Sequence, residues 1–413
     1  MPLDPARVVS NLEALRSLTG DEHGAQRVAW TETWAKGRAW LADSLSDLPL
    51  EVERDEAGND WYTLPGQSDR AVLIGGHMDS VPNGGWLDGC LNVLAGAEVL
   101  RRLAEEGTRP LTVRLVDWAD EEGARFGRSL FGSSAAAGSM TDQGELRGLV
   151  DRDGVTLPDA LAAFDVELDR VTDAGSQLES AAAYLELHIE QGPVLESLDL
   201  PLGAVLGTFG VERWRVVWTG QAAHAGSTPM DARRDALAGA ARLALALRDV
   251  AASTGDGAVC TSGDVACRPG IVTSVVETAE QLLDQRHLDP AKLASMLARA
   301  QELSREYAVA ENLDVAWERI WSIEPILFDG TLLGLADEAI AEVAGTTHRL
   351  PSGPLHDAAE VSRAGVPTVM VFVQSLRGLS HTKLEDTKAE HLELAVQALD
   401  RLTSKTLDSL ATA

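Results

Sequence analysis

Hydrophobic positions predict two kinds of element along the chain. Nearly continuous apolar runs at 71–74, 111–116, 184–189 and 368–373 are typical of strands covered on both faces of a sheet. Apolar residues recur at helical spacing in 8–18, 28–48, 91–103, 332–343 and 388–407. Because strands and helices alternate and polar loops follow the strands, we expect an α/β fold: a mixed, mostly parallel sheet flanked by helices.

A different pattern begins near residue 211. The alternating sequence ERWRVV at 212–217 is followed by a loop at 220–229, helices at 232–250 and 290–306, and a strand-like stretch that ends near Pro325. This order predicts an inserted α+β domain. A chain of 413 residues is long enough for two cores, and we therefore expect one domain from 1–210 and 326–413 and a second from 211–325.

Composition narrows the possible partners. A formal net charge of −29 argues against nucleic acid and against anionic membrane surfaces. The three cysteines form no CxxC pair, and the chain shows neither a basic, apolar leader nor an apolar run long enough to cross a bilayer. We expect a soluble, cytoplasmic protein that acts on a small molecule.

The stretch AVLIGGHMDSVPNGGWLDG places polar chemistry at the end of a strand. Gly75 and Gly76 are expected to end the strand, so that His77, Asp79 and Asp88 lie in the loop after it. Open α/β sheets bind ligands at the carboxyl ends of their strands, and an imidazole with two carboxylates suits a metal. The alternative is a polar surface loop whose Asp and Asn residues only form turns.

Other predicted strands end in the same way, with candidate ligands just past them. A single histidine is more often structural than a ligand, but several at matching positions favour a metal site. Imidazole and carboxylate ligands without thiolate suit zinc, manganese, cobalt or nickel, and a carboxylate shared by two ions would make a dinuclear hydrolytic site. The candidates are His77, Asp88, Glu121, Glu122, His188 and His381.

Five sequence blocks resemble one family. GGHMDSVPNGGWLDG, DEEGARFG with FGSSAAAG, LELHIEQGPVLE, GQAAHAGSTPMDARRDAL and GLSHTKLEDT resemble the M20-type metal-dependent amidohydrolases, in the branch of N-carbamoyl-L-amino acid hydrolases, allantoate amidohydrolases and β-ureidopropionases. The resemblance covers nearly the whole chain. It implies two divalent metal ions per chain.

The resemblance also assigns roles to residues of the first domain. It implies that His77, Asp88 and His188 hold one metal and that Asp88 bridges to a second. Glu122 and His381 would hold that second ion, and Glu121 would be the general base. Asp79 would orient the imidazole of His77 in one tautomer.

The inserted domain resembles the lid and dimerisation domain of that family. The resemblance implies a homodimer in which His224 reaches the partner's active site and stabilises the oxyanion; the alternative is a loop histidine that caps the helix after Pro229. Arg286 would bind the substrate carboxylate with two hydrogen bonds. A surface ion pair of Arg286 with Asp284 or Glu277 is the alternative.

Recognition positions match the family only in part. Gln191 and His356 match substrate-contacting positions, whereas Thr273 stands where the family usually has an asparagine, and Leu355 replaces a glycine in the loop before His356. Threonine offers no amide donor, and leucine makes the pocket more apolar. The sequence thus predicts retained hydrolysis with an altered substrate.

The expected reaction is hydrolysis of a linear C–N bond in a carboxylate-bearing N-carbamoyl substrate, such as an N-carbamoyl amino acid or an allantoate-like compound. An N-acyl amino acid or dipeptide hydrolase with the same metals is the alternative among enzymes. A non-catalytic binding protein on the same scaffold is the alternative from another class. Nucleotide binding is disfavoured, because no GxGxxG or Walker loop follows any predicted strand.

Overall fold

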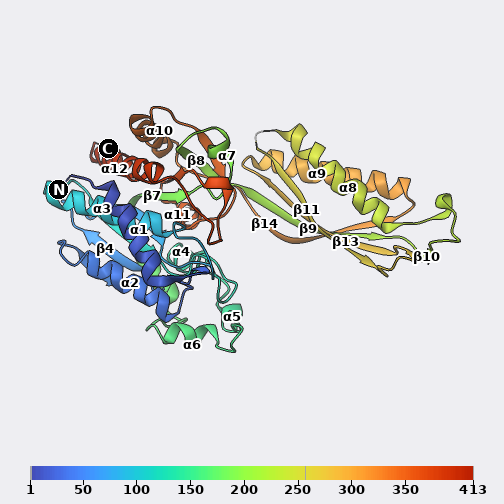
Figure 1. Cartoon of the computed structure of the whole chain (residues 1–413), viewed down its shortest axis with the longest axis horizontal. Helices are drawn as coiled ribbons and strands as arrows, with labels where there is room; N and C mark the ends of the chain where they lie inside the picture. Colours follow the sequence, from blue (N-terminus) through green and yellow to red (C-terminus); the bar gives the residue numbers. More distant parts are fainter. Residues whose placement is uncertain (1, 256, 413) are drawn as a thin grey trace. The chain divides into compact units, whose positions relative to one another are not determined.

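A computed structural model describes residues 2–255 and 257–412 and divides the chain into two compact units. Unit 1 contains Met1–Leu206 and Phe328–Ala413, and unit 2 contains Gly207–Leu327. The insertion expected at residues 211–325 lies inside unit 2. Each unit is described below by itself (Figure 1).

Unit 1 contains most of the helices. They are α1 (Pro5–Thr19), α2 (Glu32–Ser44), α3 (Cys90–Glu106), α4 (Phe131–Ala136), α5 (Gln143–Leu146), α6 (Leu157–Ala162), η1 (Val171–Leu178), α7 (Val194–Ser197), α10 (Gly330–Ala344), α11 (Asp357–Arg363), η3 (Leu376–Gly378) and α12 (Ala389–Ala411). Its strands are β1 (Gly20–Asp21), β2 (Gly24–Ala25), β3 (Glu51–Arg54), β4 (Asp60–Leu64), β5 (Ala71–His77), β6 (Thr112–Trp118), β7 (Ala181–Ile189), β8 (Leu202–Thr208, whose end belongs to unit 2), β16 (Arg349–Ser352) and β17 (Thr368–Val373).

Side-chain caps set where several helices begin. Asp4 accepts a hydrogen bond from the Arg7 backbone N–H at the start of α1. Thr31 accepts one from the Trp34 backbone N–H at the start of α2. The sequence expectation of a helix from residue 28 is therefore wrong at its start, because the residues before Thr31 lie outside the cap.

The sheet of unit 1 has the order β8-β17-β7-β5-β6-β4-β3, with β16 paired to β8. Its centre is parallel: β5 pairs in parallel with β6 and β7, and β17 pairs in parallel with β7. The outer strands β8, β4 and β3 are antiparallel to their neighbours. The predicted mixed, mostly parallel sheet is confirmed, and the carboxyl ends of its central strands meet at one edge.

Strand β5 continues through the glycines that were expected to end it. His77 is the last residue of β5, and His188 lies within β7, so neither histidine is in a loop. A Cβ atom at residue 75 would lie 2.3 Å from the Tyr184 hydroxyl, and one at residue 76 would lie 3.0 Å from Asn92 Cβ. The glycines therefore provide space for neighbouring side chains rather than a turn.

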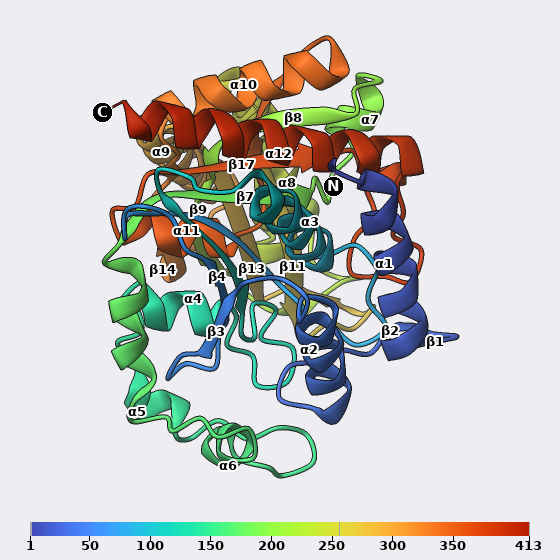
Figure 2. The ribbon, with the colours of Figure 1, turned by 90° about the vertical axis from the view of Figure 1, so that its left-hand side faces the viewer.

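Helices cover both faces of the sheet (Figure 2). On one face, α1, α3, α10 and α12 contribute to one large apolar core with residues of β5, β6, β7 and β17. Helices α4 and α11 contact the strands without contributing to that core. Alternation along β7 then places Leu185 and Leu187 in the apolar core and directs Glu186 and His188 to the opposite face.

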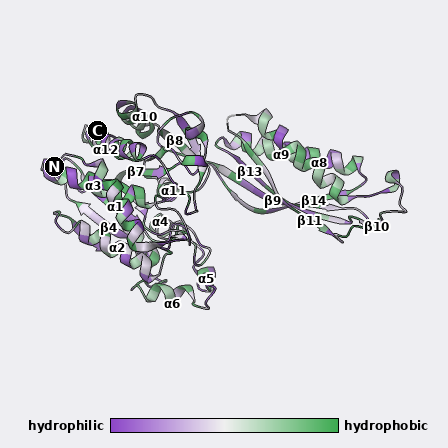
Figure 3. Ribbon diagram, in the orientation of Figure 1, coloured by the Kyte–Doolittle hydropathy of each residue, from purple (hydrophilic) through white to green (hydrophobic). Residues whose placement is uncertain are grey.

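Unit 2 is an antiparallel sheet with two helices on one face. The sheet has the order β11-β13-β9-β14, and the buried residues of the helices form their own core with it. Helices α8 and α9 carry both hydrophobic and hydrophilic residues (Figure 3). The elements of unit 2 are β9 (Gly210–Thr219), β10 (Ala223–His224), η2 (Met230–Ala232), α8 (Ala236–Thr254), β11 (Val259–Arg268), β12 (Ser274–Val275), β13 (Thr278–His287), α9 (Pro290–Ala310), β14 (Asp314–Ile323) and β15 (Ile326–Leu327).

None of the helices in the described residues has the length and apolar character that crossing a membrane requires.

Candidate metal centre

The central strands of unit 1 bring the predicted metal ligands together. His77 ends β5, Glu121 and Glu122 follow β6, His188 lies near the end of β7, and His381 lies in the loop after β17. Asp88 lies just before α3, a helix that packs against β5. These positions are far apart in sequence and meet because the parallel strands end at the same edge.

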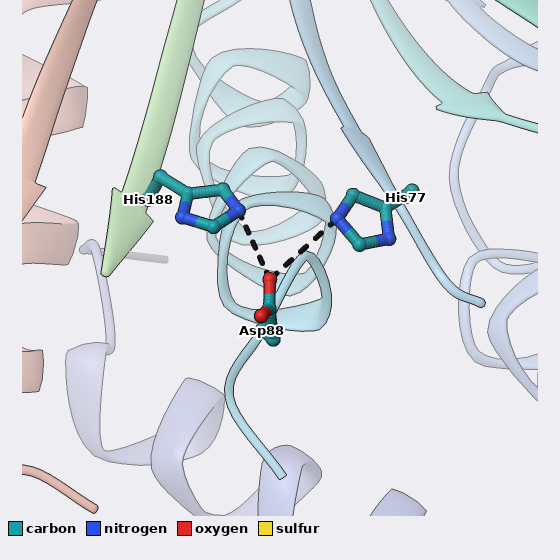
Figure 4. A group of neighbouring side chains, drawn as sticks. All are labelled: His77, Asp88 and His188. Atoms are coloured by element: carbon teal, nitrogen blue, oxygen red, sulfur yellow. Dashed lines mark ion pairs between the residues drawn. The ribbon is translucent and has the colours of Figure 1, made fainter. Parts of the chain in front are cut away.

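His77, Asp88 and His188 form one candidate ligand group (Figure 4). All three side chains are buried. His188 Nε2 lies 3.1 Å from Asp88 Oδ1, and His77 Nε2 lies 3.7 Å from the same oxygen. Both imidazole rings thus point toward one carboxylate oxygen.

Asp88 also belongs to a second candidate group, with Glu122 and His381. His381 Nε2 lies 3.5 Å from Asp88 Oδ2 and 3.3 Å from Glu122 Oε2. The Asp88 carboxylate therefore faces one ligand group with each of its oxygens. This arrangement would allow the carboxylate to be shared by two ions.

Unpartnered nitrogen atoms fit a metal at the first group. His77 Nδ1 lies 3.2 Å from the Asp79 carbonyl oxygen, and His188 Nδ1 lies 2.9 Å from the Ile189 carbonyl oxygen. A carbonyl oxygen can only accept, so each Nδ1 carries the proton. Each Nε2 therefore has a lone pair that faces the Asp88 carboxylate and receives no hydrogen bond, so these two nitrogens are the atoms that a metal ion would bind. In the second group, Glu122 Oε1 is also buried without a hydrogen-bond partner.

The negative charges around the centre also favour binding of a cation. Burial lowers the pKa of His77, but the Glu121, Asp79 and Asp88 carboxylates outweigh it and hold that pKa well above its usual value. Burial raises the pKa of Glu122 well above its usual value, and the Asp88 charge adds to the effect. Buried acids thus gather around the imidazoles, and divalent cations would balance their charge in place of bound protons.

Asp79 contacts more than the imidazole it was expected to orient. Its carboxylate is fully buried and lies 3.5 Å from His77 Nδ1. Its two oxygens accept hydrogen bonds from the backbone N–H groups of Glu121, at 3.2 Å, and Glu122, at 3.1 Å. Asp79 therefore fixes the loop that carries both glutamates.

Glu121 faces the centre. Its Oε2 lies 3.7 Å from His77 Nε2, and the residue is buried. Burial raises the pKa of Glu121 well above its usual value, although His77 opposes the shift. A buried carboxylate that faces the centre is positioned to take and return a proton.

Residues predicted to contact substrate lie in both units. In unit 1, the Gln191 side-chain amide donates to Asp88 Oδ2 at 2.8 Å. His356 is buried with its ring centroid 4.3 Å from that of His188, and burial holds its pKa well below the usual value. Leu355 is half-buried beside it.

In unit 2, His224 lies on the exposed β10–β12 ribbon, where its Nδ1 accepts from the Gly226 backbone N–H at 3.1 Å. The helix-capping alternative is wrong, since Asp235 caps α8. Thr273 is exposed on the same ribbon, and its carbonyl oxygen accepts from the Ala225 backbone N–H.

Arg286 makes the ion pair that was weighed against its substrate role. Its Nε lies 2.7 Å from Asp284 Oδ1, and its Nη2 lies 3.2 Å from Asp284 Oδ2. Arg213 shares the same carboxylate, with Nε 2.9 Å from Asp284 Oδ2. The pairing fixes the orientation of the guanidinium group, and binding of a substrate carboxylate remains a proposal.

Two residues beside the centre were not anticipated from the sequence. The Ser380 hydroxyl donates to Asp88 Oδ2 at 2.9 Å, and Glu385 Oε1 accepts from the backbone N–H groups of Leu87 and Asp88. Both lie in the GLSHTKLEDT block that contains His381. Their closeness to that histidine in sequence was the available signal.

Known proteins resemble this chain over most of its length. The model of peptidase family M20/M25/M40 matches residues 73–405. An N-carbamoyl-L-amino acid amidohydrolase of Geobacillus stearothermophilus is 34% identical, over 91% of this chain and 92% of that protein. An allantoate amidohydrolase of Escherichia coli is 32% identical, over 91% of each chain.

Among solved structures, a hydantoinase/carbamoylase family amidase from Burkholderia multivorans superposes with a TM-score of 0.88 at 30% identity, over 98% of each chain. The family match spans most of the chain, and the relatives span nearly all of it. The chain therefore belongs to peptidase family M20/M25/M40, as an amidohydrolase that acts on carbon–nitrogen bonds.

Proposed function

We propose that this protein is a dinuclear metal hydrolase that cleaves a linear C–N bond in a carboxylate-bearing N-carbamoyl substrate. The observation that carries the proposal is the Asp88 carboxylate, which takes part in both candidate ligand groups. His77 and His188 complete one metal site, and Glu122 and His381 complete the other. Zinc, manganese, cobalt and nickel all suit these donors.

When bound, two divalent ions make water a nucleophile at neutral pH and polarise the carbonyl under attack. Glu121 takes the proton of the attacking water and returns it to the departing nitrogen. Asp79 holds the Glu121 backbone so that the carboxylate faces the centre. For a carbamoyl substrate, the products are an amine, carbon dioxide and ammonia.

The named activities of the relatives support this substrate class. The matched proteins act on N-carbamoyl-L-amino acids or allantoate by name, and both compounds carry a carboxylate beside a ureido group. We propose Gln191, His356 and Leu355 as substrate contacts from unit 1. Thr273 and Arg286 would contribute from unit 2, with Arg286 binding the carboxylate.

We further propose a homodimer in which His224 of the partner subunit stabilises the oxyanion. The His224 side chain is exposed, and its Nδ1 accepts a hydrogen bond. Its Nε2 therefore carries the proton and is a donor. A donor at this position suits a developing negative charge on the carbonyl oxygen.

A substrate panel tests the proposal. Metal-reconstituted protein is incubated with N-carbamoyl amino acids, allantoate, N-acyl amino acids and dipeptides, and ammonia and free amino acid are measured separately. The proposal predicts equimolar ammonia and amino acid from at least one N-carbamoyl amino acid, or ammonia from allantoate. Amino acid released only from acyl or dipeptide substrates would establish the alternative hydrolase instead.

A further inference from the structure

Glu385 is a buried carboxylate beside the centre that has no place in the proposed reaction. It lies in the loop between β17 and α12, four residues after His381, and is 2% exposed. Its Oε1 accepts from the backbone N–H of Leu87 at 2.9 Å and of Asp88 at 3.1 Å. Its Oε2 is buried and has no hydrogen-bond partner. No lysine or arginine in the described residues forms an ion pair with it.

The surroundings of Glu385 fit its carboxylate closely. A Cβ atom at residue 85 would lie 2.0 Å from Glu385 Cδ, so only glycine leaves room at that position. The Glu385 backbone N–H donates to the Thr382 carbonyl oxygen at 2.9 Å, which closes a turn just after His381. The loop that carries one candidate metal ligand therefore holds, through Glu385, the backbone of another.

The same arrangement occurs once more at this centre. Asp79 accepts from the consecutive backbone N–H groups of Glu121 and Glu122, just as Glu385 accepts from those of Leu87 and Asp88. In each case a buried carboxylate that is not a candidate ligand fixes the main chain of a residue that is. Each buried carboxylate thereby fixes the position of the Cα atom from which a ligand carboxylate extends.

We propose that Glu385 is a positioning residue of the metal centre, which fixes the Asp88 backbone so that the Asp88 carboxylate can serve both ligand groups. The Asp88 side chain is held separately by Ser380 and Gln191, which both donate to Oδ2. Without Glu385, those contacts would remain but the backbone N–H groups at residues 87 and 88 would be buried without an acceptor. This inference rests on the proposed function, because it assumes that Asp88 binds metal.

The test measures metal affinity rather than turnover. Metal-free wild type, Glu385→Ala, Glu385→Gln and Gly85→Ala compete for zinc with a chromophoric chelator, and urea unfolding of each metal-free protein reports its stability. Asp400→Ala is the matched control: Asp400 is also buried in unit 1, but it pairs with Arg102 across helices α3 and α12.

We expect Glu385→Ala to weaken zinc binding about 10- to 100-fold, as is typical when a partner that orients a metal ligand is removed. Glutamine keeps a carbonyl oxygen for both N–H groups, so Glu385→Gln should bind zinc within about threefold of wild type. Gly85→Ala should weaken binding by displacing the Glu385 side chain, and should have no further effect when combined with Glu385→Ala. Asp400→Ala should lower stability and leave zinc affinity unchanged.

Zinc affinity of Glu385→Ala equal to that of wild type would overturn the inference. So would Glu385→Gln binding as weakly as Glu385→Ala, because charge rather than hydrogen bonding would then matter. Should Glu385→Ala fail to fold, Gly85→Ala and Glu385→Gln still decide between these outcomes. Wild type that binds no metal at all would contradict the proposed function itself, which distinguishes the two failures.

Discussion

Replacing Asp79 by asparagine tests whether Asp79 positions Glu121 and Glu122 for catalysis, beyond its contribution to the free energy of unfolding. The asparagine side chain would have one oxygen to accept and one amide to donate, whereas two backbone N–H groups, of Glu121 and Glu122, require acceptors. One hydrogen bond to a charged group is lost, and a buried donor faces another donor. The expected penalty is about 3 kcal/mol, because Asp79 is fully buried.

Much of that free energy is lost because the Glu121 backbone is no longer held in place, so the Glu121 carboxylate is less well oriented. If about 3 kcal/mol is lost in the transition state, kcat falls about 100-fold, since each 1.36 kcal/mol corresponds to a factor of ten. The assay is ammonia release at saturating metal and substrate, with metal content measured on the same sample and urea unfolding measured on metal-free protein.

Asp55→Asn is the control for this experiment. Asp55 is also buried in the β3–β4 turn, and its Oδ1 accepts from the backbone N–H groups of Ala57 and Asn59. Its Oδ2 accepts from Asn59 Nδ2 and Trp61 Nε1, so an asparagine amide there would face two donors. The control should lose comparable stability and keep kcat within about threefold. The reasoning is refuted if Asp79→Asn with full metal content keeps wild-type kcat, or if both variants lose kcat equally.

Further outcomes follow from the same geometry. Glu121→Gln should keep its metal and lose about 100- to 10,000-fold in kcat, the usual contribution of a general base, as metal analysis and ammonia release would show. His381→Ala should lower the metal content from about two ions per chain to about one, measured by mass spectrometry of dialysed protein. Mixing inactive Glu121→Gln with inactive His224→Ala should restore about a quarter of wild-type activity if His224 acts in the partner's site. Half of the dimers would then contain one subunit of each variant, and each such dimer would have one intact site. Burial raises the pKa of Asp117 to about 6 despite the Arg38 guanidinium. The protonated Asp117 carboxyl therefore stabilises the folded state; this stabilisation is complete below pH 3.8 and is lost as pH rises through 6. The free energy of unfolding of wild type should therefore fall by about 2 kcal/mol relative to Asp117→Asn between pH 4 and pH 7, and parallel curves would contradict that assignment.

Periodicity predicted the α/β architecture because the central strands are buried on both faces and contain nearly continuous apolar runs, a pattern that exposed segments rarely show. It could not predict that β5 continues to His77. β5 reaches His77 because its last residues pair with Val116, Asp117 and Trp118 of β6. The two glycines leave space for Tyr184 and Asn92, which come from other elements. The early start assigned to α2 has a similar origin, since the Thr31 cap is a local hydrogen bond that apolar spacing does not report.

The candidate ligands could be identified because each follows or ends an apolar strand and because their sequence blocks resemble a known family. The residues that hold them were harder to identify. Glu385 and Asp79 act through backbone N–H groups distant in sequence, and every residue type except proline can supply such a donor. No residue pattern marks those contacts, so only the folded chain reveals them.

The dinuclear centre is tested most directly by titrating metal-free protein with zinc or manganese. Ammonia release from an N-carbamoyl amino acid is recorded during the titration. We predict that full activity requires about two ions per chain, because Asp88 joins two ligand groups. Full activity without added metal, or a plateau at about one ion per chain, would contradict it.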